Sequence, residues 1–198
     1  MILNLEDLFQ FMKKHAKEEP LIAEDIMISA PGISTDETNR MIEAFPTLPN
    51  SYLSFITKYD VKQIDLAGYE ISVCNQKSNN FAREMIFWNG ATERRYPISK
   101  RHDLVYFGSD GFDEFFVAGT KSDYKEGEIL SIDHECYEDK SIPIKRVAPD
   151  YETFLIICAN KYQLQMNGEQ GLETFMKELR LRLDALNLPK EYYDYWVW

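Results

Sequence analysis

The sequence lacks the features that identify a membrane protein, a secreted disulfide scaffold or a nucleic-acid-binding protein. No stretch approaches the roughly 18 consecutive apolar residues that a membrane span needs. Three cysteines, Cys74, Cys136 and Cys158, are odd in number and far apart, which predicts free thiols in a reducing compartment. Lys and Arg number 22 against 33 Asp and Glu, and this net charge of −11 argues against binding to a phosphate backbone.

A secretion signal is also missing from the first residues. The segment 1–7, Met-Ile-Leu-Asn-Leu-Glu-Asp, has neither a basic n-region nor a small-residue cleavage site. We therefore expect a cytoplasmic protein with no membrane partner.

The common enzyme signatures are absent as well. There is no GxSxG, no GxxxxGK, no GxGxxG and no cysteine in a catalytic phrase. The run 133–136, Asp-His-Glu-Cys, could bind metal, but strand alternation separates His134 and Cys136 from their neighbours, and zinc needs about four converging ligands. The acidic segment 110–114 lacks the spacing of a calcium loop. We expect no catalytic residue, metal or cofactor, and no enzyme.

Composition predicts one folded domain, or one domain with an appended element. The chain has 198 residues, of which 44% are hydrophobic and 14% aromatic, enough for a buried core. Helices are predicted at five places from caps and from apolar residues at spacings of three and four. The first helix covers residues 5–16 after Asn4, and the second follows the capping box Ser34–Glu37, with Thr38, Met41, Ile42 and Phe45 buried. The third starts at Pro49 and has the core face Tyr52, Phe55, Ile56 and Tyr59. The fourth begins near Asp150, with Tyr151, Phe154, Leu155 and Cys158 on one face, and the last has the apolar stripe Leu172, Phe175, Met176, Leu179, Leu183 and Leu186.

Strands are predicted between these helices, where the apolar period approaches two. They cover residues 63–66 and 69–73 around Ala67-Gly68, then 84–88, 104–107, 114–118 and 128–132, with an edge strand at 142–145. Helices at both ends of hairpin-linked strands predict an α+β fold, with N-terminal and C-terminal helices packed on one face of a mostly antiparallel sheet.

Negative charge is concentrated on this strand region. Residues 102–139 contain eleven Asp and Glu against two Lys, a net charge of −9. Such a concentration indicates a surface for a basic partner. The candidate contact residues, expected to be exposed, are the acids Asp110, Asp113, Glu114, Asp123, Glu126, Glu135, Glu138 and Asp139, with the aromatic residues Tyr106, Tyr124 and Tyr137 as anchors.

Several phrases in order resemble the SUKH superfamily, the fungal cell-wall-synthesis regulators and bacterial toxin-immunity proteins. They span roughly residues 30–160: Ile33-Ser-x-x-Glu37, Leu48-Pro-x-x-Tyr52-x-x-Phe55-x-x-x-Tyr59, Gly108-Ser-Asp-Gly-x-Asp-Glu-Phe-Phe116, Gly127-Glu-Ile-Leu-x-Ile-Asp-His-Glu135 and Asp150-Tyr-Glu-Thr-Phe-Leu155. The chain departs from the pattern at Asp60-Val61-Lys62, where the family has a glycine-rich turn. Residues 165–198 also extend beyond its usual end.

The resemblance implies a SUKH-like domain over residues 1–164 and a helical extension over 165–198. It also implies a non-enzymatic immunity protein that occludes a basic toxin, commonly a nuclease or nucleotide-modifying domain. The alternatives are a regulatory or scaffolding adaptor without a toxin partner, and a domain that binds or hydrolyses a small molecule. The aromatic tail 192–198 is expected to pack on the domain or on a second subunit, which would make a homodimer through the C-terminal helix.

Overall fold

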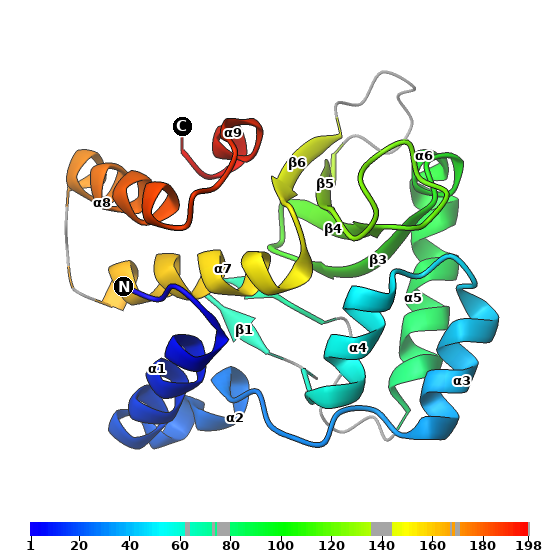
Figure 1. Cartoon of the computed structure of the whole chain (residues 1–198), viewed down its shortest axis with the longest axis horizontal. Helices are drawn as coiled ribbons and strands as arrows, with labels where there is room; N and C mark the ends of the chain where they lie inside the picture. The colour runs from blue at the N-terminus through cyan, green and yellow to red at the C-terminus, as the bar shows by residue number, and fades with distance from the viewer. Residues whose placement is uncertain are drawn as a thin grey trace.

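An antiparallel sheet with helices around it confirms the α+β class (Figure 1). The computed structural model describes residues 1–61, 64–72, 74, 80–135, 144–166, 168 and 171–197. In these residues six strands pair in sequence order, β1 to β6. The strands are β1 Asp65–Leu66, β2 Tyr69–Glu70, β3 Leu104–Ser109, β4 Asp113–Ala118, β5 Ile129–Asp133 and β6 Lys145–Ala148.

The helices lie before, between and after these strands. They are α1 Leu5–Glu18, η1 Pro20–Ile22, α2 Ala23–Ile26, α3 Thr35–Ala44, α4 Asn50–Lys58, α5 Phe81–Arg95, α6 Pro97–Arg101, α7 Tyr151–Met166, α8 Leu172–Ala185, η2 Lys190–Tyr192 and α9 Tyr193–Trp196. Two predicted starts are confirmed. The Asn4 side chain accepts from the Asp7 amide, and Ser34 and Glu37 form the capping box of α3.

The hairpin at Ala67-Gly68 is also confirmed, although its strands are shorter than predicted. Both turn residues have positive φ, 62° and 83°, as the tight turn between two twisted strands requires. The next pairing requires a glycine at position 108, because a Cβ there would lie 2.0 Å from the carbonyl oxygen of Glu70. Gly108 therefore allows β2 to approach β3.

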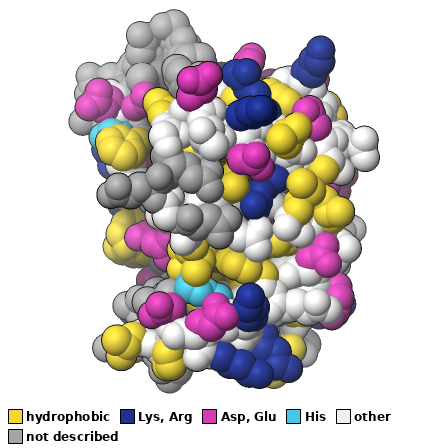
Figure 2. All heavy atoms as spheres, turned by 90° about the vertical axis from the view of Figure 1, so that its left-hand side faces the viewer, with side chains coloured by type: hydrophobic (Ala, Val, Ile, Leu, Met, Phe, Trp, Pro, Cys, Tyr) yellow, Lys and Arg dark blue, Asp and Glu magenta, His cyan; other side chains and the backbone are white. Residues whose placement is uncertain are grey.

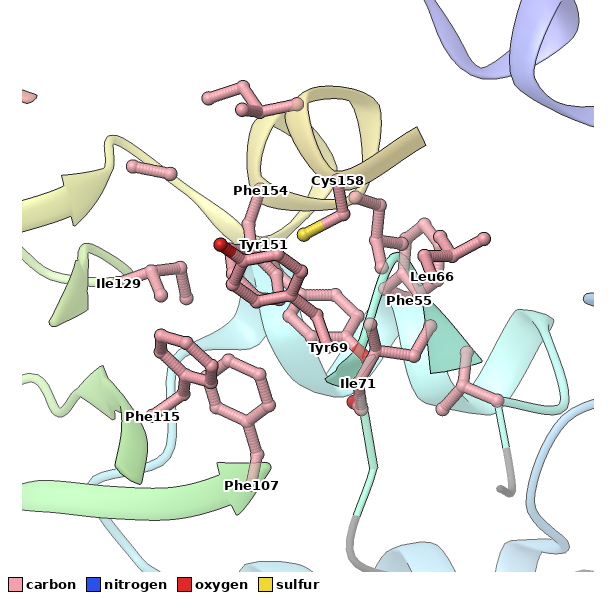
Figure 3. Close-up of a cluster of buried hydrophobic side chains, with 14 of the residues drawn as sticks. Phe55, Leu66, Tyr69, Ile71, Phe107, Phe115, Ile129, Tyr151, Phe154 and Cys158 are labelled. Carbon is pink, nitrogen blue, oxygen red and sulfur yellow. The ribbon is translucent and has the colours of Figure 1, made fainter. Parts of the chain in front are cut away.

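Aromatic side chains fill the space between α7 and the sheet (Figure 3). The ring of Tyr151 lies between α4 and β3, with its centroid 4.8 Å from that of Tyr52 and 5.2 Å from that of Phe107. Phe154 makes the same kind of edge contact with Phe107, at 5.6 Å. The predicted buried face of α7 is confirmed, since Tyr151, Phe154, Leu155 and Cys158 are all buried.

The opposite face of the sheet is buried too, so the prediction of helices on one face is wrong. Tyr96 and Ile98, at the junction of α5 and α6, pack on a second cluster of side chains from the strands. These are Leu104, Tyr106, Phe116, Ala118, Leu130 and Ile132. A strand that is covered on both sides has buried residues at consecutive positions. Accordingly, five of the six residues of β4 are buried.

The C-terminal segment packs on its own chain. On α8, Leu179 and Leu183 are fully buried, and Arg182 donates to the Asn160 side chain on α7 at 3.1 Å. In the tail, the Trp196 indole donates to the Val147 carbonyl of β6 at 2.7 Å, and its ring contacts Phe154. These rings belong to the core of this chain and are not available to a second subunit.

Three predictions of secondary structure or burial are wrong. Residues 84–88 belong to the helix α5 and not to a strand, because the buried positions of this segment recur at helical spacing. Ile42 on α3 and Leu172 on α8 are 48% and 77% exposed, although both belong to predicted apolar stripes. In the described parts of the chain, no helix combines the length and hydropathy required to cross a membrane.

Two buried tyrosines provide a matched test of this core. The Tyr151 hydroxyl donates to the Ile71 carbonyl at 2.7 Å, whereas the Tyr52 hydroxyl has no hydrogen-bond partner among the described residues. Tyr151→Phe should lower the free energy of unfolding by about 1–3 kcal/mol, because it leaves a buried carbonyl without this donor. Tyr52→Phe should be neutral or stabilising. Urea unfolding of both variants measures the difference, and equal losses would contradict the hydrogen-bond assignment.

Candidate protein-binding site

The predicted acidic residues do not form one continuous surface. The β3–β4 turn and the end of β5 lie at one end of the strands, whereas the β4–β5 loop 119–128 lies at the other. A strand of six residues such as β4 separates the two ends by about 20 Å. Glu138, Asp139 and Tyr137 lie outside the described residues.

At the turn end, five residues form a compact group that we call the acidic tip. It consists of Asp110 and Phe112 in the turn, and Asp133, His134 and Glu135 at the end of β5. The two segments are joined because the His134 amide donates to the Phe112 carbonyl at 2.8 Å. The His134 ring also contacts this carbonyl through Nδ1, and because a carbonyl oxygen can only accept, Nδ1 carries the hydrogen.

Asp110 organises the turn from inside. One carboxylate oxygen accepts from the Phe112 and Asp113 amides at 3.0 and 2.8 Å, and the other accepts from the Tyr195 hydroxyl at 3.2 Å. This is the hydrogen-bonding pattern by which Asp replaces backbone partners in a turn. Asp110 is therefore half-buried and structural, while its charge still contributes to the potential of the acidic tip.

Phe112 is the residue at this end that the sequence reasoning missed. Its side chain is 74% exposed, and its ring centroid lies 6.1 Å from that of His134. Glu135 is exposed, and the Asp133 carboxylate accepts from the Glu135 amide at 2.9 Å. An exposed aromatic ring beside carboxylates has the chemistry of an interface anchor. The sequence contained one signal for this residue, because a large apolar side chain in a predicted turn is expected to be exposed.

Three predicted contact residues are not freely exposed. Asp113 and Tyr106 are each 8% exposed, and the Glu114 side chain is 15% exposed with the Arg95 guanidinium 4.0 Å away. Their exposure was predicted wrongly, because these strands are covered on both faces. Tyr106 packs in the second cluster and is not a free anchor.

The remaining predicted residues lie in the loop 119–128. Asp123 and Glu126 are exposed, but the Asp123 carboxylate pairs with His102 Nδ1 at 2.8 Å. Tyr124 is half-buried, with the Arg146 guanidinium over its ring at 5.7 Å. Lys121 and Lys125, also exposed, neutralise part of the loop. This end is consequently a weaker candidate than the acidic tip.

The face formed by α1 and α8 has mixed charge. Figure 2 shows the side formed by α1 below and α8 above, where acidic and basic side chains are interspersed and basic ones gather at the lower edge. The exposed lysines of α1 are Lys13, Lys14 and Lys17. Among the residues that the structure describes, no three His, Cys, Asp or Glu side chains converge as a metal site, and Cys136 lies outside them.

Comparison with models of known protein families gave no match, and no curated protein matched the chain. The SUKH resemblance thus depends on the quoted residues alone and stays a prediction.

Asp113 provides a pH test of the strand beneath the acidic tip. Burial raises the pKa of its carboxyl group above the ordinary 3.8, while Lys145 acts in the opposite direction. A raised pKa in the folded state means that the contribution of Asp113 to stability is present below pH 3.8 and is lost as pH rises through the folded-state pKa. Asp113→Asn should therefore raise the melting temperature at pH 7, with a gain that shrinks toward pH 3.

The control for removal of a charge alone is Asp194→Asn, since Asp194 is exposed on α9. Melting temperatures at several pH values compare the two variants. A gain for Asp113→Asn that does not change with pH would contradict the role of the buried carboxylate.

Proposed function

We propose that this protein is a non-enzymatic binding protein of the immunity type, which attaches to a basic protein toxin through the acidic tip and occludes it. The observation that carries the proposal is Phe112, a 74% exposed aromatic residue between carboxylates at a rigid turn. The SUKH resemblance supports the toxin as the kind of partner. The proposed partner surface excludes Asp113 and Tyr106, which are buried.

Electrostatics supports the choice of a basic partner. A net charge of −11 attracts a basic protein over long range, and the acidic residues nearest the contact set the orientation of the encounter. Toxins that act on nucleic acids or nucleotides need positive charge in their own substrate clefts, which the acidic tip could occupy. The mechanism needs only charge and shape at the interface.

A rigid tip would reduce the entropic cost of binding. The turn is stabilised by the hydrogen bonds of Asp110 to backbone amides, by the contact between Phe112 and His134, and by the hydrogen bond from the Tyr195 hydroxyl to Asp110. Residues ordered before binding lose less freedom when they bind, so more of the contact energy appears as affinity. This supports direct docking of the tip without refolding.

The state of Cys158 supports a cytoplasmic location within this proposal. Cys158 is a buried free thiol, the form that a reducing compartment maintains. Burial also raises the pKa of the Cys158 thiol, which keeps it protonated and unreactive.

The test uses paired double variants with equal loss of charge. Asp133→Asn with Glu135→Gln changes the acidic tip, and Asp123→Asn with Glu126→Gln changes the opposite loop. The tip variant should slow association with the proposed basic toxin by about tenfold at low salt. The loop variant should change the rate by less than about twofold. Stopped-flow association across a salt series measures both.

Phe112→Ser tests the anchor independently of charge. It should raise the dissociation rate by about thirtyfold, corresponding to roughly 2 kcal/mol, with little change in the association rate. Rescue of growth when the toxin and this protein are co-expressed provides the functional readout. The proposal fails if both tip variants bind and protect like the wild type. Binding to a partner that is not toxic would favour the regulatory or scaffolding adaptor.

A further inference from the structure

Four polar side chains form a hydrogen-bond chain that runs from α7 through the core to the acidic tip. On α7, the Lys161 ammonium donates to the Tyr69 hydroxyl of β2 at 2.5 Å. The Tyr69 and Tyr195 side chains are hydrogen-bonded to each other. Tyr195 then donates to the Asp110 carboxylate at 3.2 Å. Side chains of β2 and α9 therefore connect α7 to the β3–β4 turn.

Most of this hydrogen-bond chain lies inside the protein. Tyr69 and Tyr195 are 4% and 9% exposed, and Lys161 is half-buried. The Tyr69 ring points into the core beneath α7 (Figure 3). Burial lowers the pKa of the Lys161 ammonium, whereas Cys158 and Asp110 act in the opposite direction. Because polar groups in the interior need partners, each member of the chain depends on its neighbours.

The chemistry of its two ends gives the hydrogen-bond chain one direction. An ammonium group can only donate, a carboxylate can only accept, and a hydroxyl has a single hydrogen. Tyr195 is hydrogen-bonded to Asp113 as well as to Asp110, so its hydrogen points to a carboxylate. The Tyr195 oxygen must then accept from Tyr69, whose oxygen accepts from Lys161. Every donor therefore points from α7 toward the acidic tip.

A positive charge at the donor end strengthens the bonds of such a chain. A hydroxyl that accepts from a cation becomes a stronger donor to the next group, and the effect is larger where water is excluded. Lys161 also interacts with the charge of Asp110, which in turn acts on Asp113. At the far end, Asp110 accepts from the Phe112 and Asp113 amides. The order of the turn thus depends on a lysine of another element.

We propose that Lys161 is a positioning residue for the acidic tip, acting on it through Tyr69 and Tyr195. With the hydrogen-bond chain intact, Asp110 holds the turn in the conformation that presents Phe112. The value of this order for binding rests on the proposed toxin contact. The order itself is a property of the free protein, so measurements without any partner distinguish a failure of this inference from a failure of the proposed function.

Amide hydrogen exchange of the free full-length chain, followed by NMR, measures the order of the turn. Lys161→Met preserves most of the side-chain length but removes the donor and the charge. It should speed exchange of the Phe112 and Asp113 amides by about tenfold. The Glu37 amide, held by the cap of α3, should exchange as in the wild type. The control Lys177→Met removes an exposed positive charge from α8 and should leave all three amides unchanged.

A double-mutant cycle tests the route from Lys161 to the turn. Tyr69→Phe removes the hydroxyl that links Lys161 to Tyr195 and preserves the ring in the core, so it should also speed exchange of the turn amides. The double variant should exchange no faster than the faster single variant, because both changes break the same chain. Effects that multiply would show that Lys161 acts by another route and would overturn the proposal.

The Tyr195 ring provides a second readout. In protein with isotope-labelled tyrosine rings, Lys161→Met should shift the NMR signal of the Tyr195 Cζ atom. In the Tyr69→Phe background the same substitution should leave this signal in place, a dependence that a loss of packing alone would not produce. Unchanged exchange of the turn amides in Lys161→Met, or an equal increase at the Glu37 amide, would also contradict a positioning role.

Discussion

Burial of the central sheet on both faces is the constraint on which the rest of this structure depends. Tyr151 and Phe154 of α7 close one face, and Tyr96 and Ile98 at the α5–α6 junction close the other. A carboxylate on a covered strand loses its water and becomes internal, as Asp113 does. Surface chemistry is consequently confined to turns, loops and the outward faces of helices, and the proposed toxin contact lies at a turn.

Local chemistry made some elements predictable from the sequence. The capping box of Ser34 and Glu37 and the apolar face of α7 are decided within one or two turns of chain. The helix α5 was not predictable from residues 84–88, since five residues with two outward aromatic side chains hide the helical period. Asp113 lies on the same face of β4 as Phe115, which contacts Tyr195 of the C-terminal segment, so its burial depends on residues distant in sequence, and no local pattern contains that information.

The candidate site shows the same division between local and tertiary information. Strand prediction correctly placed a turn between β3 and β4. Gly111 in this turn has a positive φ of 85°, which glycine adopts at little cost. The grouping of Phe112 with Asp133 and Glu135 depends instead on the antiparallel register of β4 and β5, which pairs Asp113 with Asp133. Counting charge along the sequence treated as one surface two groups of acids that lie at opposite ends of the sheet.

The hydrogen bond from Tyr195 to Asp110 connects the last helical turn of the chain to the turn that presents Phe112. Substitutions at Asp110 would remove one acceptor of the buried Tyr195 hydroxyl, and loss of the tail would remove the hydrogen bond that Tyr195 donates to the turn. In the evolution of this protein the two positions should therefore change together. Within the proposed toxin contact, specificity could then diversify through Phe112 and Glu135, whose exposed side chains can be replaced without repacking the interior.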